Sequence, residues 1–281
     1  MSWTLITNDD GITAPGLHAL AAAAVAAGHR VVVAAPDEQA SGAGTSLITR
    51  QRNGRVPTVR HELPDLPGVP AYGVGAQPAF ISFAAMRGWF DEPPSLVLSG
   101  INEGANTGEA VLHSGTVGAA LTAGRLGARA LAVSLSLAHT PPGVQPRYSV
   151  AAGLLPPMLA LLDRTPPGTV LNLNVPDRAA ADLGPPEVAT LARRGRVEFR
   201  VNNLSGDELG VHSVQTPGEP EPGTDVALLA AGRATLTALR SVTESPTLPL
   251  ADLLADLLAE LKAGLRVELQ AEPRAELPTN H

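Results

Sequence analysis

Two adjacent aspartates, Asp9 and Asp10, lie where a short apolar run ends and an alanine-rich helical pattern begins. The run at residues 3–7 predicts a buried strand, and residues 15–27 predict a helix. Their junction is the carboxyl end of a first strand, where open α/β sheets place ligand sites. Neighbouring carboxylates repel each other, so a cation that neutralises them would favour this placement. A hard divalent metal and phosphate chemistry are therefore expected.

Strand and helix patterns continue to alternate through the first 180 residues. Apolar runs at residues 31–35, 96–98, 130–135 and 170–175 predict strands, and residues 116–126 predict a helix of small residues. This alternation predicts an α/β fold, with a Rossmann-like, doubly wound and mostly parallel sheet.

The sequence predicts three regions. Residues 1–180 form the expected Rossmann-like catalytic core. Residues 181–265 predict a β-rich extension, with a β-hairpin and a C-terminal helix, that serves oligomerisation. In that helix the leucines of residues 250–261 fall on one face, which suits packing on the chain's own core or on another subunit. Residues 266–281 predict a tail.

Composition excludes several functional classes. The 281 residues carry a net charge of −7, which argues against a nucleic-acid polymer as partner. The absence of cysteine excludes thiolate catalysis and Cys-ligated zinc, and Lys262, the single lysine, lies in no P-loop motif. The start of the sequence does not resemble a signal peptide, and no apolar run is long enough to cross a bilayer, so we expect a cytoplasmic protein without a membrane partner.

Four polar loops could carry the chemistry, at residues 8–11, 36–42, 99–108 and 113–120. Three of them, taken alone, are equally typical of an ordinary turn or helix cap, and residues 36–42 alone are more typical of a plain polar loop. Loops that follow successive parallel strands converge on one edge of the sheet, so together they predict a single site.

The residue types in these loops suit a hard cation and a phosphate. Ser41 offers a weak oxygen ligand, and Asn102 and Asn106 offer amide oxygens and N–H donors. Residues 114–116 open a helix whose N-terminus suits an anion, whereas His113 is more typical of a structural histidine than of a general acid. This oxygen-rich set fits Mg²⁺ or Mn²⁺ better than zinc.

Four stretches, residues 7–20, 31–49, 96–121 and 171–176, carry a resemblance to a known family. In their order they resemble the SurE family, the stationary-phase survival protein E, whose members are metal-dependent nucleotide phosphatases. Residues 75–81 depart from the family's usual GTPADCV, with Phe80 in place of its Asp.

The resemblance implies a site, a cofactor and an assembly. Family members remove phosphate from nucleoside 5′- and 3′-monophosphates, and some from short polyphosphate. The resemblance also implies one Mg²⁺ or Mn²⁺ per subunit and a homodimer or homotetramer. The implied metal ligands are Asp9, Asp10, Ser41 and Asn102; the implied catalytic residues are Asp9 and Asp10; the implied phosphate contacts are Asn8, Asn106, Ser114, Gly115 and Thr116.

The mechanism we expect is in-line attack on phosphorus by a metal-activated water. One alternative makes Asp9 a nucleophile that forms a phosphoaspartate. A dinucleotide-dependent oxidoreductase would need G-x-G-x-x-G where this chain has residues 8–11. A non-catalytic nucleotide or metal sensor on the same fold is the remaining alternative.

Overall fold

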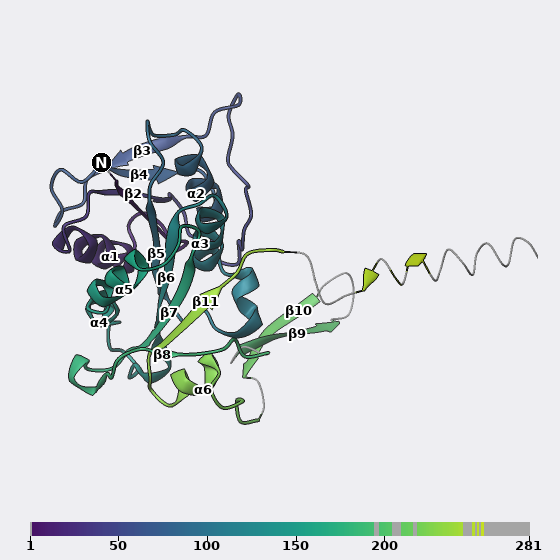
Figure 1. Cartoon of the computed structure of the whole chain (residues 1–281). Coiled ribbons are helices and arrows are strands. Elements are labelled where there is room, and N and C mark those ends of the chain that lie inside the picture. Colours follow the sequence, from purple (N-terminus) through teal and green to yellow (C-terminus); the bar gives the residue numbers. More distant parts are fainter. Residues whose placement is uncertain are drawn as a thin grey trace, which may run out of the picture. The chain divides into compact units, whose positions relative to one another are not determined.

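The computed structural model of the chain shows an α/β fold. The residues described are 2–193, 197–203, 209–215, 218–243, 249, 250, 252, 254 and 255. The chain divides into two units, Met1–Ser241 and Val242–His281. The first contains a nine-stranded sheet with helices on both faces (Figure 1).

Six neighbouring parallel strands form the centre of this sheet. The strand order is β3-β4-β2-β1-β5-β6-β7-β11-β8, and every pair from β4 to β7 is parallel. The central strands are β4 (Ala71–Val74), β2 (Val31–Pro36), β1 (Thr4–Thr7), β5 (Leu96–Glu103), β6 (Arg129–Ser136) and β7 (Val170–Pro176). Their runs of valine, leucine and alanine are buried on both faces, as a parallel sheet between two helical layers requires.

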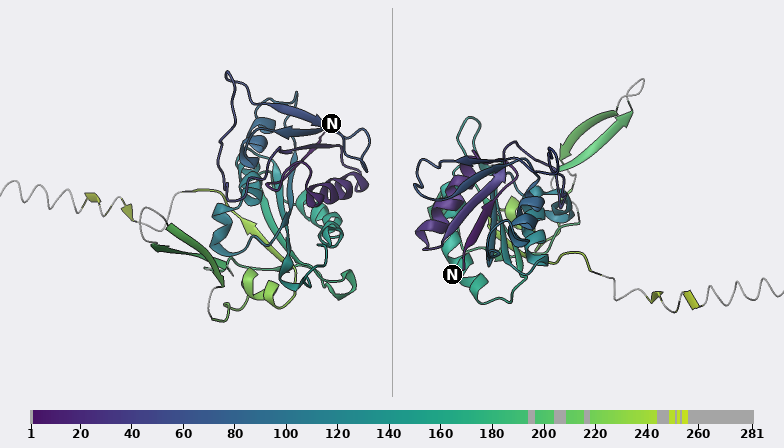
Figure 2. Two further views of the ribbon diagram at one scale, coloured as in Figure 1. Left: turned by 180° about the vertical axis from the view of Figure 1, so that it is seen from behind. Right: turned by 90° about the horizontal axis from the view of Figure 1, so that it is seen from above.

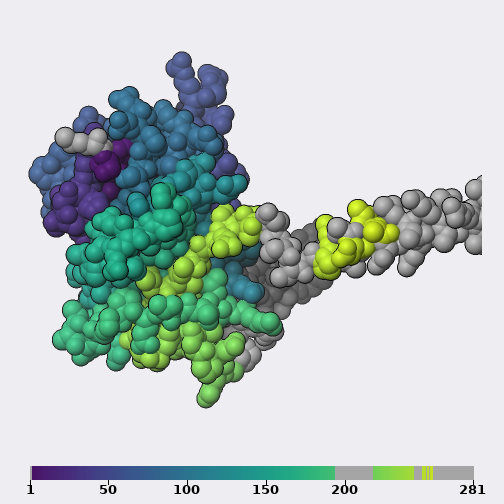
Figure 3. All heavy atoms as spheres, in the orientation of Figure 1, coloured from purple at the N-terminus to yellow at the C-terminus, as the bar shows by residue number. Residues whose placement is uncertain are grey.

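The outer strands make the sheet mixed. On one side β3 (Thr58–His61) runs antiparallel to β4. On the other side β11 (Thr235–Leu239) runs antiparallel to β7, and β8 (Glu187–Val188) pairs parallel with β11. The space-filling view shows the yellow-green chain of β11 in contact with the green residues beside it (Figure 3).

Two helical layers cover the sheet. α1 (Pro15–Ala26), α4 (Tyr148–Ala152) and α5 (Leu155–Asp163) cover one face, and α2 (Pro78–Met86) and α3 (Gly115–Arg125) cover the other (Figure 2). The remaining elements are α6 (Asp225–Ala230) and the 3₁₀ helices η1 (Gly108–His113), η2 (Leu137–His139) and η3 (Ala180–Asp182).

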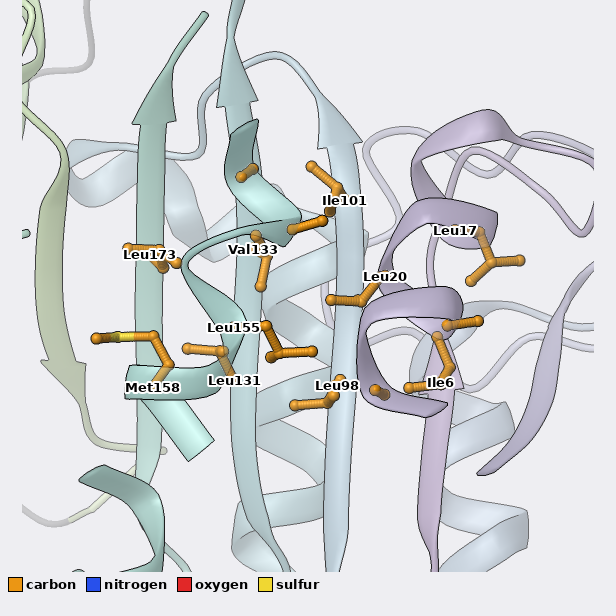
Figure 4. Packing of buried hydrophobic residues seen from close by; sticks show 14 of the residues in the cluster. Ile6, Leu17, Leu20, Leu98, Ile101, Leu131, Val133, Leu155, Met158 and Leu173 are labelled. Carbon is orange, nitrogen blue, oxygen red and sulfur yellow. The ribbon is translucent and has the colours of Figure 1, made fainter. Parts of the chain in front are cut away.

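Burial of aliphatic side chains holds the layers together. On the α1 face, Leu17 and Leu20 pack over Ile6 and Leu98, and Leu155 of α5 packs over Leu131 (Figure 4). All these side chains are fully excluded from solvent. Each contributes roughly 1.5–3 kcal/mol relative to an exposed position.

The chain order of the central strands creates the position for a site. From β1 the chain passes to β2 on one side, and it later returns to β5 on the other side of β1. This is the topological switch point of a doubly wound sheet, and the loops that leave β1 and β5 part there to form a crevice.

The predicted fold class is confirmed, and all five predicted strands and both predicted core helices exist within a few residues of the expected bounds. Sequence patterns missed β3, β4, α2, α4, α5 and α6. Phe80, the departure from the family pattern, lies in α2 and packs against the apolar cluster on that face.

The region after residue 180 is only partly separate from the core. Residues 181–241 belong to the same compact unit, because β8 and β11 complete the sheet, whereas the sequence predicts a boundary at residue 180. A hairpin does follow, with β9 (Val197–Asn203) antiparallel to β10 (Leu209–Gln215). Most of the predicted helix at residues 250–261 and all of the predicted tail at 266–281 lie outside the described residues. Over the described part of the chain, no helix has the length and apolarity that a bilayer crossing needs.

Candidate active site

An open cleft with a volume of about 1280 Å³ lies at the carboxyl edge of the sheet. It is bounded by the loops after β1, β2 and β5, by the end of η1, and by the first residue of α4. Among the residues predicted for the site, six line it: Asp9, Asp10, Ser41, Asn102, Asn106 and Ser114. The convergence expected from the strand order therefore occurs.

Asp9 is the buried centre of the site, with only 5% of its surface exposed. Its Oδ1 accepts a hydrogen bond of 2.5 Å from the hydroxyl of Thr116, in the first turn of α3. That hydroxyl also lies 3.2 Å from Oδ1 of Asn102. Thr116 thus connects ligand candidates from two strands.

The side-chain amide of Asn102 has a defined orientation. Its Nδ2 donates to the carbonyl of Gly104 over 2.8 Å, which turns Oδ1 toward Thr116 and Asp9. A hydroxyl carries one hydrogen, and the shorter contact of Thr116 is with Asp9. The Asn102 oxygen therefore keeps lone pairs for a cation.

Gly115 lets the start of α3 approach Asp9 closely. A Cβ placed on Gly115 would lie 2.8 Å from both Cβ and Oδ2 of Asp9, closer than real contacts allow. Glycine at this position is therefore a packing requirement of the site, beyond its place in a helix start.

Burial raises the pKa of Asp9 above its ordinary value, although hydrogen bonds from the Thr116 hydroxyl and from the backbone of residues 115 and 116 oppose the shift. Asp10 is half-buried, and its Oδ2 accepts a 3.2 Å hydrogen bond from the backbone N–H of Glu103. Burial, and then the charges of Asp9 and Glu103, raise the pKa of Asp10 to about 6. Both shifts indicate carboxylates without a compensating positive charge.

A divalent cation fits this arrangement. Among the described residues, neither Asp9 nor Asp10 forms an ion pair with an arginine or histidine. Within the same part of the chain, no three His, Asp or Glu side chains gather around one point, so any metal here must also take neutral oxygen ligands. The Asn102 amide and the Ser41 hydroxyl supply such oxygens, which Mg²⁺ and Mn²⁺ accept.

Ser41 reaches the cleft on the loop after β2. The backbone N–H of Ala40 donates to the carbonyl of Asp9 over 2.7 Å, which ties this loop to the end of β1. The Ser41 side chain is exposed, and its Oγ accepts a hydrogen bond from Gln39 at 3.1 Å. Its hydroxyl remains accessible from the cleft.

Asn106 is held by two strands at the base of the cleft. Its Nδ2 donates to Ser134 over 2.9 Å, and its backbone N–H donates to Asn174 over 2.8 Å. Its carbonyl accepts from the amides of Asn172 and Asn174, both at 2.9 Å. One Nδ2 hydrogen of Asn106 is left for a ligand.

Ser114 caps the N-terminus of α3. Its Oγ accepts from the backbone N–H of Val117 over 3.1 Å, so its hydroxyl hydrogen remains available as a donor in the cleft. The helix start also contributes a partial positive charge.

Three predicted phosphate contacts do not line the cleft. Asn8 is fully buried and uses both ends of its amide on the backbone of Gly11, which fixes the turn after β1. Thr116 is fully buried against Asp9 and Asn102, and Gly115 lies beneath Asp9. In this structure these residues position the ligand candidates, and direct contact with phosphate stays a prediction for them.

Sequence patterns missed several residues that line the cleft: Thr13, Gln39, Glu103, Glu109, Tyr148 and Arg193. Tyr148 donates to Oε2 of Glu103 over 2.7 Å. The start of α4 and the segment at residue 193 carry no motif, and only the folded chain brings them to the cleft.

An ion pair between the partly exposed Arg147 and the buried Asp177 fixes the start of α4. Arg147 donates from Nε to Oδ1 of Asp177 over 2.8 Å, and Thr140 donates to Oδ2 over 2.6 Å. The side chain of Asp177 is fully buried. Although burial alone would raise the pKa of Asp177, the bonds from Thr140 and Arg147 outweigh it and lower that pKa. This network fixes Arg147, the residue that precedes Tyr148 of the cleft.

The chain is similar to several known proteins. Residues 4–198 match the family model described as survival protein SurE. The chain is 37% identical over 243 residues to a 5′-nucleotidase SurE of Xanthomonas axonopodis pv. citri (strain 306), covering 84% of this chain and 88% of that protein. It is also 37% identical over 241 residues to a 5′-nucleotidase SurE of Pseudomonas putida (strain W619), covering 84% and 91%. A crystal structure of a SurE protein from Aquifex aeolicus superposes with a TM-score of 0.70 at 28% identity, covering 86% of this chain and 94% of that one.

Proposed function

Because this chain belongs to the SurE family, we propose that it is a divalent-metal-dependent hydrolase that acts as a 5′-nucleotidase on nucleoside monophosphates. One observation carries the proposal. Two carboxylates without a basic partner among the described residues, Asp9 and Asp10, lie at the switch point beside an amide oxygen and a helix N-terminus.

The metal candidates are Mg²⁺ and Mn²⁺, one per subunit, held by Asp9, Asp10, Ser41 and Asn102. When bound, such a cation would polarise a phosphate oxygen and lower the pKa of a bound water. The raised pKa values of the two aspartates support this assignment, because a cation removes the cost of keeping both charged.

The chain's own groups would orient the phosphate. The free hydrogens of Asn106 and Ser114, together with the start of α3, can donate to phosphate oxygens. Water would then attack phosphorus in line with the leaving ribose oxygen, and Asp9 or Asp10 would accept its proton.

Two substitutions test the site. Asp9→Asn removes a negative charge, and Asn102→Ala removes the neutral oxygen ligand. We expect each to remove most phosphate release from AMP or GMP, with the far-ultraviolet circular dichroism spectrum unchanged. Near-normal activity in both variants would refute the assignment.

Experiments can distinguish this proposal from a covalent mechanism and from a non-catalytic sensor. In a covalent mechanism Asp9 would be the nucleophile, and burst kinetics or a trapped phosphoenzyme would reveal it. A non-catalytic nucleotide or metal sensor would bind AMP and Mn²⁺ without steady release of phosphate. Release that depends on Mn²⁺ and stops on addition of EDTA separates the enzyme from the sensor.

Nucleoside 3′-monophosphates and short polyphosphate are further proposed substrates, tested by a phosphate-release screen across nucleotides and metals. We also propose a cytoplasmic homodimer or homotetramer that uses residues 181–265 as its contact. The leucine face of residues 250–261 in the sequence supports an oligomer. Light scattering on the purified protein would give its mass.

A further inference from the structure

The charge of the cleft is unfavourable for an anionic substrate. Four carboxylates of the described residues line it, those of Asp9, Asp10, Glu103 and Glu109. A nucleoside monophosphate carries close to two negative charges at neutral pH. One divalent cation would balance only the two aspartates, so a further positive charge is needed near the phosphate.

Among the residues that the structure describes, Arg193 is the one arginine that lines this cleft. Its side chain is exposed, and it forms no ion pair with any residue that the structure describes. Its guanidinium is therefore available for a ligand, and its planar set of donors matches phosphate oxygens.

The backbone beside Arg193 is fixed to the wall of the cleft by Asp225. This aspartate is fully buried, and its Oδ1 accepts from the N–H groups of Ala192 at 3.0 Å and Val226 at 2.8 Å. Its Oδ2 accepts from the N–H of Gly108 at 2.8 Å. A buried carboxylate is costly unless it is hydrogen-bonded, so these bonds define its position.

A further hydrogen bond joins the segment at residue 192 directly to the start of η1. The N–H of Glu109 donates to the carbonyl of Ala192 over 2.9 Å. Asp225 and this bond therefore attach the residue before Arg193 to the start of η1. Since η1 connects Asn106 to Ser114, Arg193 is tied to the part of the cleft where phosphate contacts are expected.

We propose that Arg193 binds the phosphoryl oxygens of the substrate and that Asp225 is the positioning residue that holds Arg193 at the cleft. This inference rests on the proposed phosphatase function and adds a substrate-binding residue to it. Arg193 lies in the segment after β8 and reaches the cleft from there. The other expected site residues come from the loops after β1, β2 and β5 and from the start of α3.

The first test compares Arg193→Ala and Arg193→Lys with two substrates, AMP and p-nitrophenyl phosphate, in the presence of Mn²⁺. These substrates share only the phosphoryl group. We expect Arg193→Ala to lower kcat/KM about 10- to 100-fold for both, and Arg193→Lys to recover part of the loss as a point charge. A loss confined to AMP, or no loss, would overturn the inference.

Two controls test whether Arg193→Ala acts indirectly, through the metal site or through a general loss of positive charge. The Mn²⁺ affinity of Arg193→Ala, measured by calorimetry, should equal that of the wild type, and a weaker affinity would contradict a role limited to phosphate. Arg125→Ala serves as the control, because this exposed arginine ends α3 at the end remote from the cleft.

The positioning role is tested with Asp225→Asn, in which one oxygen becomes an amide nitrogen that cannot accept an N–H bond. We expect a loss of kcat/KM in the same direction as for Arg193→Ala. In the double variant the two losses should not add, because both act through one contact. Additive losses would show that Asp225 does not act through Arg193 and would overturn its positioning role.

A binding measurement separates this inference from the proposed function. Inorganic phosphate titrated into the Mn²⁺-loaded protein reports the contact even without turnover. If the wild type releases no phosphate from any substrate, the proposed function fails. If Arg193→Ala binds inorganic phosphate as tightly as the wild type, the inference fails whatever the activity.

Discussion

Thr116 donates its hydroxyl hydrogen to Oδ1 of Asp9 over 2.5 Å, and this bond joins the start of α3 to the end of β1. Asp9 lies in the loop directly after β1, a strand in the middle of the sheet, and Thr116 lies 107 positions later in the chain. One bond thus fixes the carboxylate and places a helix N-terminus beside it. The geometry of the cleft depends on this pair.

Replacing Thr116 by valine tests the pair, because valine keeps the shape and removes the hydroxyl. Asp9 would lose its orienting donor, so we expect Mn²⁺ to bind about 10- to 100-fold more weakly, as for other residues that orient metal ligands. Thr116→Ser retains the hydroxyl and should stay close to the wild type. Calorimetric titration measures both, and equal affinity in the valine variant would show that the bond is dispensable.

Gly115→Ala should disturb the same contact by steric overlap. The added methyl would come within 2.8 Å of Asp9, so α3 or the carboxylate must move. We expect a loss of roughly 1–3 kcal/mol in the free energy of unfolding and weaker Mn²⁺ binding. Gly184→Ala is the matched control, since its Cβ would meet nothing within 4 Å. Urea denaturation of both variants decides, and similar stability in the two would contradict the packing requirement.

Divalent metal should stabilise the folded chain. A cation that binds only the native state adds about 2.7 kcal/mol when its concentration is one hundred times its dissociation constant. We therefore expect Mn²⁺ to raise the melting temperature of the wild type and EDTA to reverse the increase. Asp9→Asn should show little increase at the same concentration. An equal increase in that variant would locate the metal elsewhere.

The ion pair of Arg147 with the buried Asp177 gives a pH-dependent prediction. The pKa of Asp177 is lowered on folding, so its contribution to stability is present above its ordinary value of 3.8 and is lost as pH falls through the lower folded value. Arg147→Ala should cost roughly 1–3 kcal/mol at neutral pH, because it removes a charged donor from a buried carboxylate. The difference from the wild type should shrink in acid.

The control for this prediction is Arg233→Ala. Arg233 pairs with Glu187 at 2.9 Å, but the two side chains are 50% and 42% exposed, so we expect a cost below about 1 kcal/mol. Denaturation at pH 7 and at pH 3 measures both variants. A cost for Arg147→Ala that is the same at both values would contradict the assigned role of Asp177.

The sequence predicted the part of the site that lies next to strands. Asp9 and Asp10 follow a buried run, and Asn102 follows another, so the rule that parallel strands end at one edge was enough to bring them together. Ser41 follows from the same rule, because it lies in the loop after β2, and Ser114 follows from its capping position directly before α3.

The parts that sequence patterns missed depend on contacts between distant segments. α2, α4 and α5 have few polar positions to mark their solvent faces, so their periodicity is weak. The segment next to Arg193 is joined to η1 by two hydrogen bonds: the N–H of Gly108 donates to the Asp225 carboxylate, and the N–H of Glu109 donates to the carbonyl of Ala192. No periodic pattern in the sequence marks such bonds. The positioning roles of Asn8 and Thr116 likewise depend on which way a buried side chain points.

The most direct measurement is anomalous X-ray diffraction from crystals of the wild-type protein grown with Mn²⁺. The account predicts one manganese peak between the carboxylates of Asp9 and Asp10, within coordinating distance of the oxygen atoms of Asn102 and Ser41. An absence of anomalous density at this point in crystals of active protein, or a peak bound only by other residues, would contradict it.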